Sequence, residues 1–239
     1  QEGLEPIMQM TCRDRNRLAM QADIFGAVCF GVRNLLCLSG DHQRFGNHAT
    51  AKNVYDLDSV QLVGMVARMR DAGLTLGGEP IEGSVPMFVG AAENPFGDPF
   101  EMRVIRLAKK VAAGVDFIQT QCIFDLPRFK EWMRRVVDRG LHEKVHILAG
   151  VMPLKSAGAA RYINANVAGI TVPDAIVARM AGAGKGQKAR DEGLKLCAET
   201  IQQVREIEGV HGVHIMAVEW EEAIRPIGEM AGLLPRPEL

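Results

Sequence analysis

Short apolar runs of strand length alternate with helical segments along the whole chain, and this alternation limits the fold more than any other feature. Most runs are continuously apolar, as expected for parallel strands that are covered on both faces. Strands that alternate with helices in this way build a parallel sheet. We predict strands at residues 7–12, 34–40, 87–92, 117–124, 145–153 and 213–220, and a short run at 168–173 that is either a seventh strand or a connection. We predict helices at residues 14–30, 58–72, 99–114, 127–140, 156–164, 174–181, 189–208 and 221–231.

The number of predicted strands bears on the architecture. The chain has 239 residues, close to the roughly 250 of a typical (β/α)₈ TIM barrel, and no polar linker divides it. Only about six of the eight strands of such a barrel are present. We therefore expect one TIM-barrel domain over residues 1–239, from which the first two β/α units are missing.

Composition excludes several classes of partner. Lys and Arg number 28 against 29 Asp and Glu, so the formal charge of −1 gives no field that would attract nucleic acid or an anionic membrane. No apolar run approaches the roughly 20 residues of a membrane span, and no signal segment is visible. The five cysteines are scattered, and most of them lie within apolar runs, as in reduced intracellular proteins. These features predict a cytoplasmic globular protein that binds neither nucleic acid nor membrane.

Polar residues stand at the predicted carboxyl ends of two strands, where barrels build their sites. Ser39, Gly40 and Asp41 open a long loop, and the glycine would let the backbone approach a planar ligand closely. The same residues also fit a plain turn. Strand alternation places Gln119 and Gln121 on one face, where their amides either satisfy each other internally or bind a ligand with donor and acceptor groups; Gln121 lies nearer the strand end.

Two further patterns are weaker. Gln9 and Thr11 share a face near the end of the first strand. In the helix at 99–114, a basic stripe either faces solvent or binds the phosphates of a ligand. Its members are Arg103, Arg106 and Lys110, with Lys109 beside them. No His and Glu spacing predicts a metal site, so we expect none.

Several segments, in this order, resemble the methylenetetrahydrofolate reductase family. The matching stretches are QMTC at 9–12, LSGD at 38–41, YDLDSVQLV from Tyr55, KKVAAGVDFIQTQCIFD at 109–125, GVMP at 150–153 and the closing GLLPRPEL. The resemblance runs from about residue 5 to the C-terminus. The segments AENPFGDPFEMRVIRLAKKV and HIMAVEWEEA resemble the branch found in bacteria and archaea with one-carbon or acetyl-CoA pathways.

The resemblance implies a flavoprotein that reduces 5,10-methylenetetrahydrofolate to 5-methyltetrahydrofolate by hydride transfer through flavin N5, with NADH or NADPH as the reductant. Asp41 matches the family's carboxylate that meets the flavin ring and the pterin, so it is expected to be catalytic and to contact the substrate. Gln121 matches a glutamine that contacts folate or nicotinamide. The residues expected at the cofactor are Gln9, Thr11, Ser39, Gly40, Asp41, Tyr55, Lys109 and Lys110.

The chain also departs from the family pattern. Gln9 stands where a histidine is frequent, and Ser39 where many members have an arginine. Arg103 and Arg106 replace the Asp and Asn with which the FAD-binding type holds its adenosine end, so both FAD and FMN remain open.

The first strand of the family, which carries a glutamate that acts as general acid, is expected in the part that precedes this sequence. The alternative is a flavin- and folate-binding subunit that relies on an electron-transferring partner. Either form is expected to be a homo- or hetero-oligomer.

Overall fold

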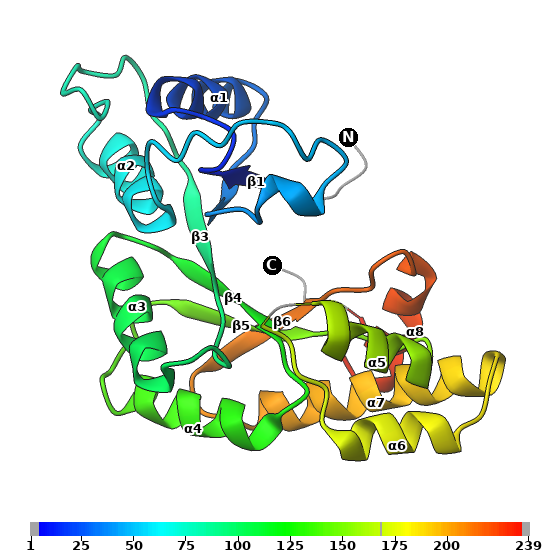
Figure 1. Cartoon of the computed structure of the whole chain (residues 1–239). Helices are drawn as coiled ribbons and strands as arrows, with labels where there is room; N and C mark the ends of the chain where they lie inside the picture. Colours follow the sequence, from blue (N-terminus) through cyan, green and yellow to red (C-terminus); the bar gives the residue numbers. More distant parts are fainter. Residues whose placement is uncertain (1–4, 168, 236–239) are drawn as a thin grey trace. The chain divides into compact units, whose positions relative to one another are not determined.

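Six parallel strands alternate with helices in the computed structural model, which describes residues 5–167 and 169–235 (Figure 1). The strands are β1 (Ile7–Thr11), β2 (Asn34–Leu38), β3 (Phe88–Glu93), β4 (Phe117–Cys122), β5 (His146–Val151) and β6 (Val210–Ile215). The helices are α1 (Arg17–Cys29), α2 (Ser59–Asp71), α3 (Phe100–Ala112), α4 (Leu126–Val137), α5 (Ala157–Asn166), α6 (Asp174–Gly182), α7 (Gln187–Arg205) and α8 (Ile224–Met230), with short 3₁₀ helices η1 (Gln43–Phe45) and η2 (Glu221–Ala223). The sheet order β1-β2-β3-β4-β5-β6 follows the sequence, as in a TIM barrel, and confirms the predicted α/β fold with six strands.

The described residues form two compact units. The first contains residues 5–92 and 105–118, and the second contains residues 93–104, 119–167 and 169–235. The prediction of a single barrel domain over residues 1–239, preceded by two further β/α units, stays a prediction. The last residues of the GLLPRPEL stretch lie outside the described residues.

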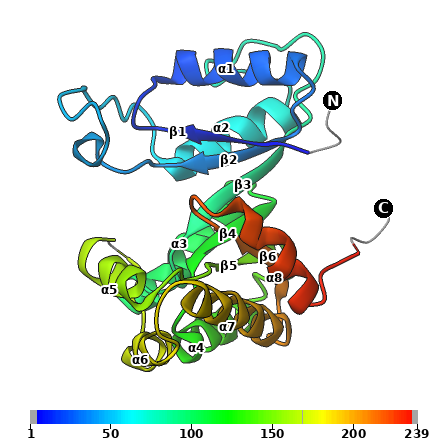
Figure 2. The same cartoon turned by 90° about the vertical axis from the view of Figure 1, so that its right-hand side faces the viewer.

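In the first unit, β1 pairs in parallel with β2, and α1 and α2 lie alongside these strands (Figure 2). Leu35, Leu36 and Cys37 in the middle of β2 are buried. The rings of Phe88 and Phe117 stack with their centroids 5.4 Å apart. A Cβ at Gly90 would collide with the Phe117 ring, so only glycine fits between the two strands.

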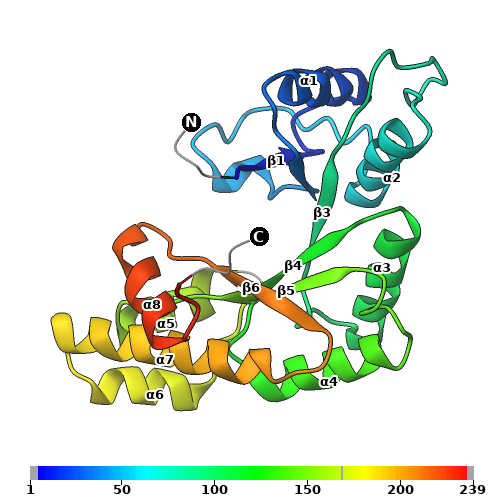
Figure 3. The ribbon, with the colours of Figure 1, turned by 180° about the vertical axis from the view of Figure 1, so that it is seen from behind.

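In the second unit, β5 pairs in parallel with β6, and α7 packs against both strands (Figure 3). The ladder contains a bulge, because Ile147 is opposite Val210 whereas the next residue, Leu148, is opposite Gly212. His211 therefore has no partner in the ladder. Its Nδ1 instead accepts a hydrogen bond from the Ile147 N–H (3.2 Å).

The structure decides between the two alternatives for one segment and moves one predicted strand. The described part of the run at 168–173 is a connection, because the Asn164 side chain bonds both backbone groups of Val172, at 2.6 Å to its N–H and 2.9 Å to its carbonyl. The strand predicted at 213–220 lies earlier, at Val210–Ile215. Extended structure cannot continue to residue 220, since Glu219 has a φ of 51°.

Candidate functional site

In the first unit, the ends of β1 and β2 bring a glycine and three charged side chains together. Gly40 follows β2 with a φ of 85°, and a Cβ there would lie 3.1 Å from the Cβ atoms of both Thr11 and Arg13. Glycine is required because of both the backbone conformation and this close approach. The turn leaves the Asp41 side chain exposed at the carboxyl end of the strand.

Arg13 joins the two strand ends through its guanidinium. Its Nε and Nη2 donate to the two carboxylate oxygens of Asp14 at 2.7 and 2.8 Å, and its Nη1 donates to the Asp41 carbonyl at 2.7 Å. Thr11 adds a hydroxyl donor to Asp14 at 2.9 Å. The hydrogen bonds from Arg13 lower the pKa of Asp14, so this carboxylate stays charged well below neutral pH.

The segment before α2 runs across the end of β1. The Val54 N–H donates to the Arg13 carbonyl (2.8 Å), and the Tyr55 N–H donates to the Cys12 carbonyl (3.2 Å). Tyr55 has a φ of 45°, and its side chain is exposed. Positive φ at a bulky residue marks a backbone that its surroundings hold in place.

The structure brings only part of the predicted set together. Thr11, Gly40, Asp41 and Tyr55 lie around the segment that follows β1, because each bonds or closely approaches one of its residues. The Ser39 hydroxyl contacts the Ser59 hydroxyl at 3.2 Å. Gln9, by contrast, lines an open groove between the free edge of β1 and α1.

The predicted basic stripe on α3 does not form one exposed surface. Lys110 is 4% exposed, and its Nζ donates to the carbonyl of Ala92 at 2.6 Å. Arg106 and Lys109 are exposed. Two cations of the stripe are thus accessible from solvent, whereas Lys110 ties α3 to the end of β3.

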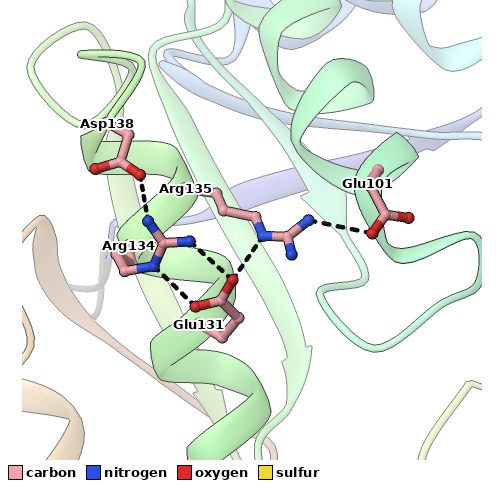
Figure 4. A network of polar contacts seen from close by, with 5 residues as sticks. All are labelled: Glu101, Glu131, Arg134, Arg135 and Asp138. Carbon is pink, nitrogen blue, oxygen red and sulfur yellow. Dashed lines mark hydrogen bonds and ion pairs between the residues drawn. The ribbon is translucent and has the colours of Figure 1, made fainter.

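Two arginines of α4 and a glutamate at the start of α3 belong to a surface network in the second unit (Figure 4). Glu131 accepts from Arg134 (2.9 Å) and Arg135 (2.8 Å), and these arginines also contact Asp138 (2.6 Å) and Glu101 (3.4 Å) respectively. Exposed ion pairs of this kind add little stability each. We interpret the network as a tie between the two helices and not as an anion site.

Arg103 folds back on its own loop. Its Nη2 donates to the Asp98 carbonyl (3.2 Å), and its guanidinium lies 3.0 to 3.1 Å from the position that a Cβ of Gly97 would take. This arginine therefore supports the segment between β3 and α3.

In the second unit, β4 ends in a polar sequence that is partly engaged. The Gln121 Oε1 accepts from the Cys122 N–H (3.0 Å), so the free part of its amide is the NH₂ donor. Thr120 is buried, and its hydroxyl accepts from the Gly150 N–H at 2.8 Å. Gln119 is also buried. The contact between Gln121 and a ligand stays a prediction.

Sequence reasoning missed Arg13, Asp14 and Thr120. A signal for the first two was present, because a charged pair directly after a strand lies at the edge where barrels build sites. Thr120 gave no signal, since its role depends on a bond to a neighbouring strand.

The thiols offer no reactive group in the buried parts of the structure. Burial raises the pKa of the Cys12 thiol to about 11. The described cysteines are free, four of them buried and Cys29 exposed.

Within residues 5–167 and 169–235, no group of three His, Cys, Asp or Glu side chains is placed to hold a metal ion. Nor does this part of the chain contain a helix of the length and apolarity that a membrane crossing requires.

Comparison with known proteins points to one family. The model of the family described as "Methylenetetrahydrofolate reductase" matches residues 1–232. Methylenetetrahydrofolate reductase 2 of Schizosaccharomyces pombe is 24% identical over 241 residues, covering 96% of this chain and 36% of the relative. Methylenetetrahydrofolate reductase 2 of Saccharomyces cerevisiae is 26% identical over 234 residues, covering 98% of this chain and 37% of the relative. The chain thus spans about a third of the length of these curated relatives.

A solved structure shares the fold. It is an uncharacterized protein from Clostridium thermocellum that binds two copies of 5-methyl-5,6,7,8-tetrahydrofolic acid. The TM-score is 0.55 at 10% identity, and the match covers 94% of this chain and 71% of that one. At this identity the likeness shows the fold alone.

Proposed function

Because the chain belongs to the methylenetetrahydrofolate reductase family, we propose that it carries the catalytic barrel of a flavin-dependent reductase. The substrate is 5,10-methylenetetrahydrofolate, the product is 5-methyltetrahydrofolate, and NADH or NADPH is the reductant. The observation that supports this most is the exposed carboxylate of Asp41, which Gly40 sets at the carboxyl end of β2. Barrel enzymes build their active sites from this end of their strands.

The residues at the ends of β1 and β2 fit a flavin. Tyr55, whose N–H donates to the Cys12 carbonyl just after β1, exposes 44% of its surface and offers an aromatic face to a planar ring. When bound, the flavin supplies hydride-transfer chemistry. Arg106 and Lys109 are exposed cations of the same unit, and we assign to them the phosphate of FAD or FMN.

Asp41 has an electrostatic role in this proposal. Its carboxylate makes no hydrogen bond or ion pair with the described residues, since Arg13 binds its main-chain carbonyl instead. A free carboxylate stabilises the positive charge that develops on the folate as its five-membered ring opens.

Gln121 is the folate contact that we propose for the second unit. Its oxygen already accepts one hydrogen bond, from the Cys122 N–H, and we assign to its NH₂ group the bond to the folate. An amide donor of this kind recognises a carbonyl or ring-nitrogen acceptor.

The test is a visible spectrum of the protein expressed from its complete gene and supplied with FAD or FMN. We expect a bound flavin that NADH or NADPH bleaches and that 5,10-methylenetetrahydrofolate then reoxidises. If neither flavin binds, the proposal is refuted. If flavin binds and only reduced ferredoxin or a partner protein bleaches it, the chain is a flavin- and folate-binding subunit that depends on an electron donor.

Asp41→Asn separates the two half-reactions. We expect folate reduction to slow on the order of 100-fold, because a neutral amide no longer stabilises the developing charge. Flavin reduction by NAD(P)H should change far less. Stopped-flow absorbance measures both steps, and Asp138→Asn in the surface network serves as the control. Equal slowing of both half-reactions would count against the assigned role.

A further inference from the structure

We propose that Arg13 is a positioning residue that holds Asp41 and the segment around Tyr55 at the ends of β1 and β2. This inference rests on the proposed function, in which Asp41 acts on the folate. Arg13 Nη1 donates to the Asp41 carbonyl at 2.7 Å, across 28 residues of sequence. The bond fixes the main chain of Asp41 while its carboxylate stays available for a ligand.

The guanidinium is itself held in one orientation. One edge, formed by Nε and Nη2, pairs with both oxygens of Asp14, and Thr11 donates to the same carboxylate. The hydrogen bond to Asp14 raises the pKa of Arg13, which is therefore charged at every working pH. A planar fork can bind a carboxylate with one edge and a carbonyl with its other nitrogen, whereas a lysine ammonium is a single point.

The same residue also anchors the segment before α2. Its carbonyl accepts from the Val54 N–H at 2.8 Å, next to the bond from the Tyr55 N–H to Cys12. Tyr55 keeps a φ of 45°, which a bulky residue holds only where its neighbours fix it. Arg13 thus touches both ends of the long loop between Asp41 and Tyr55, one end with its side chain and the other with its backbone.

Gly40 shows how closely these parts are built together. A Cβ at this position would press on the Cβ of Arg13 at 3.1 Å, so the turn and the arginine occupy adjoining space. Loss of the Arg13 side chain would release the carbonyl of Asp41 and leave a gap beside the turn. We expect the loop to open more often and the Asp41 carboxylate to lose its fixed position.

The first experiment does not depend on activity. Arg13→Gln, Arg13→Lys and the control Arg15→Gln are digested with trypsin under native conditions, and mass spectrometry follows cleavage after Arg44 and Lys52 within the loop. Arg15 is a matched control, because it also pairs with an aspartate, Asp23, at 2.6 Å. We expect Arg13→Gln to be cleaved about tenfold faster than the unchanged protein, Arg13→Lys only partly restored, and Arg15→Gln unchanged.

The second experiment measures the two half-reactions in the same variants. Arg13→Gln should slow reduction of 5,10-methylenetetrahydrofolate about tenfold and leave flavin reduction by NAD(P)H within about twofold. A purely structural defect would slow both steps alike, which would overturn the positioning role, as would loop cleavage at the rate of the unchanged protein. If the unchanged protein does not reduce folate at all, the proposed function fails, while the cleavage rates still decide whether Arg13 holds the loop. Should Arg13→Gln not fold, Arg13→Lys carries the same two comparisons.

Discussion

Thr120→Val should lower the free energy of unfolding of the second unit by about 1 to 3 kcal/mol. Thr120 is 3% exposed, and its hydroxyl accepts from the buried Gly150 N–H at 2.8 Å while donating to the Gln121 carbonyl at 3.1 Å. Valine has nearly the same shape but no oxygen, so the Gly150 N–H loses its partner where water cannot replace it. A larger residue at position 150 cannot fill the space, because a Cβ at Gly150 would collide with the Thr120 carbonyl.

Urea unfolding followed by tryptophan fluorescence measures this loss, since Trp132 is fully buried in the same unit. Thr200→Val is the matched control. The Thr200 hydroxyl donates to the Leu196 carbonyl of its own helix at 2.9 Å, and removing it leaves no buried donor behind. We expect the control to change stability by less than about 0.5 kcal/mol and Thr120→Ser to retain most of the native value. If Thr120→Val and Thr200→Val cost the same, the bond across β4 and β5 does not stabilise the unit as argued.

The remaining predictions concern the imidazole of His211 and the buried ammonium of Lys110. Burial and neighbouring histidines lower the pKa of His211 below its ordinary 6.5. The unfolded chain therefore binds more protons than the native one, and the free energy of unfolding falls as the pH drops through about 6.5. His211→Asn keeps an acceptor for the Ile147 N–H and should reduce the change in the urea midpoint between pH 7.5 and 5.5, whereas an unchanged pH dependence would assign it to other groups. Lys110→Met should lower the free energy of unfolding in urea by about 1.5 to 3 kcal/mol, because the charged hydrogen bond to the Ala92 carbonyl is lost. The control Lys109→Met, at an exposed position, should change it by less than about 0.5 kcal/mol. Equal losses in the two variants would contradict the buried position of Lys110.

Local sequence signals were sufficient for the helices and for most strands. Asp58 begins α2 because its side chain accepts from the Gln61 N–H while the Gln61 side chain accepts from the Asp58 N–H, a pattern visible in the sequence as Asp-x-x-Gln. Pro127 lies in the first turn of α4, where its missing N–H costs nothing. Such signals act within one turn of helix and need no knowledge of the fold.

The two ends of β6 could not be predicted, because they depend on contacts with distant parts of the chain. The run from 213 to 220 is apolar enough for a strand, but the strand begins at Val210, with His211 in a bulge. The bulge is possible because the imidazole accepts the Ile147 N–H that the ladder leaves unpaired. That compensation involves a residue 64 positions away, so no local pattern contains it.

Lys110 illustrates a limit of helical periodicity. The spacing of three and seven residues places Lys110 on the same side of the helix as Arg103 and Arg106. Whether that stripe is exposed depends on how far the neighbouring strand extends. The end of β3 reaches Lys110 and presents the Ala92 carbonyl to it, and this covers one end of the stripe while Arg106 stays open.

The cluster around Arg13 depends partly on local sequence signals and partly on contacts between distant residues. The positions of Asp14 and Asp41 directly after two strands predict that their backbones reach the same edge of the sheet, because β1 and β2 are parallel and in register up to Thr11 opposite Leu38. The sequence does not contain the direction of the Arg13 side chain, which depends on an aspartate beside it and a carbonyl 28 residues away. Glycine is required at position 40 by its φ of 85° and by the Cβ atoms of Thr11 and Arg13 beside it, so the turn and the arginine constrain each other. A change at either position should therefore disturb Asp41 in the same way, and Gly40→Ala is expected to speed loop cleavage as Arg13→Gln does, since both release the same turn.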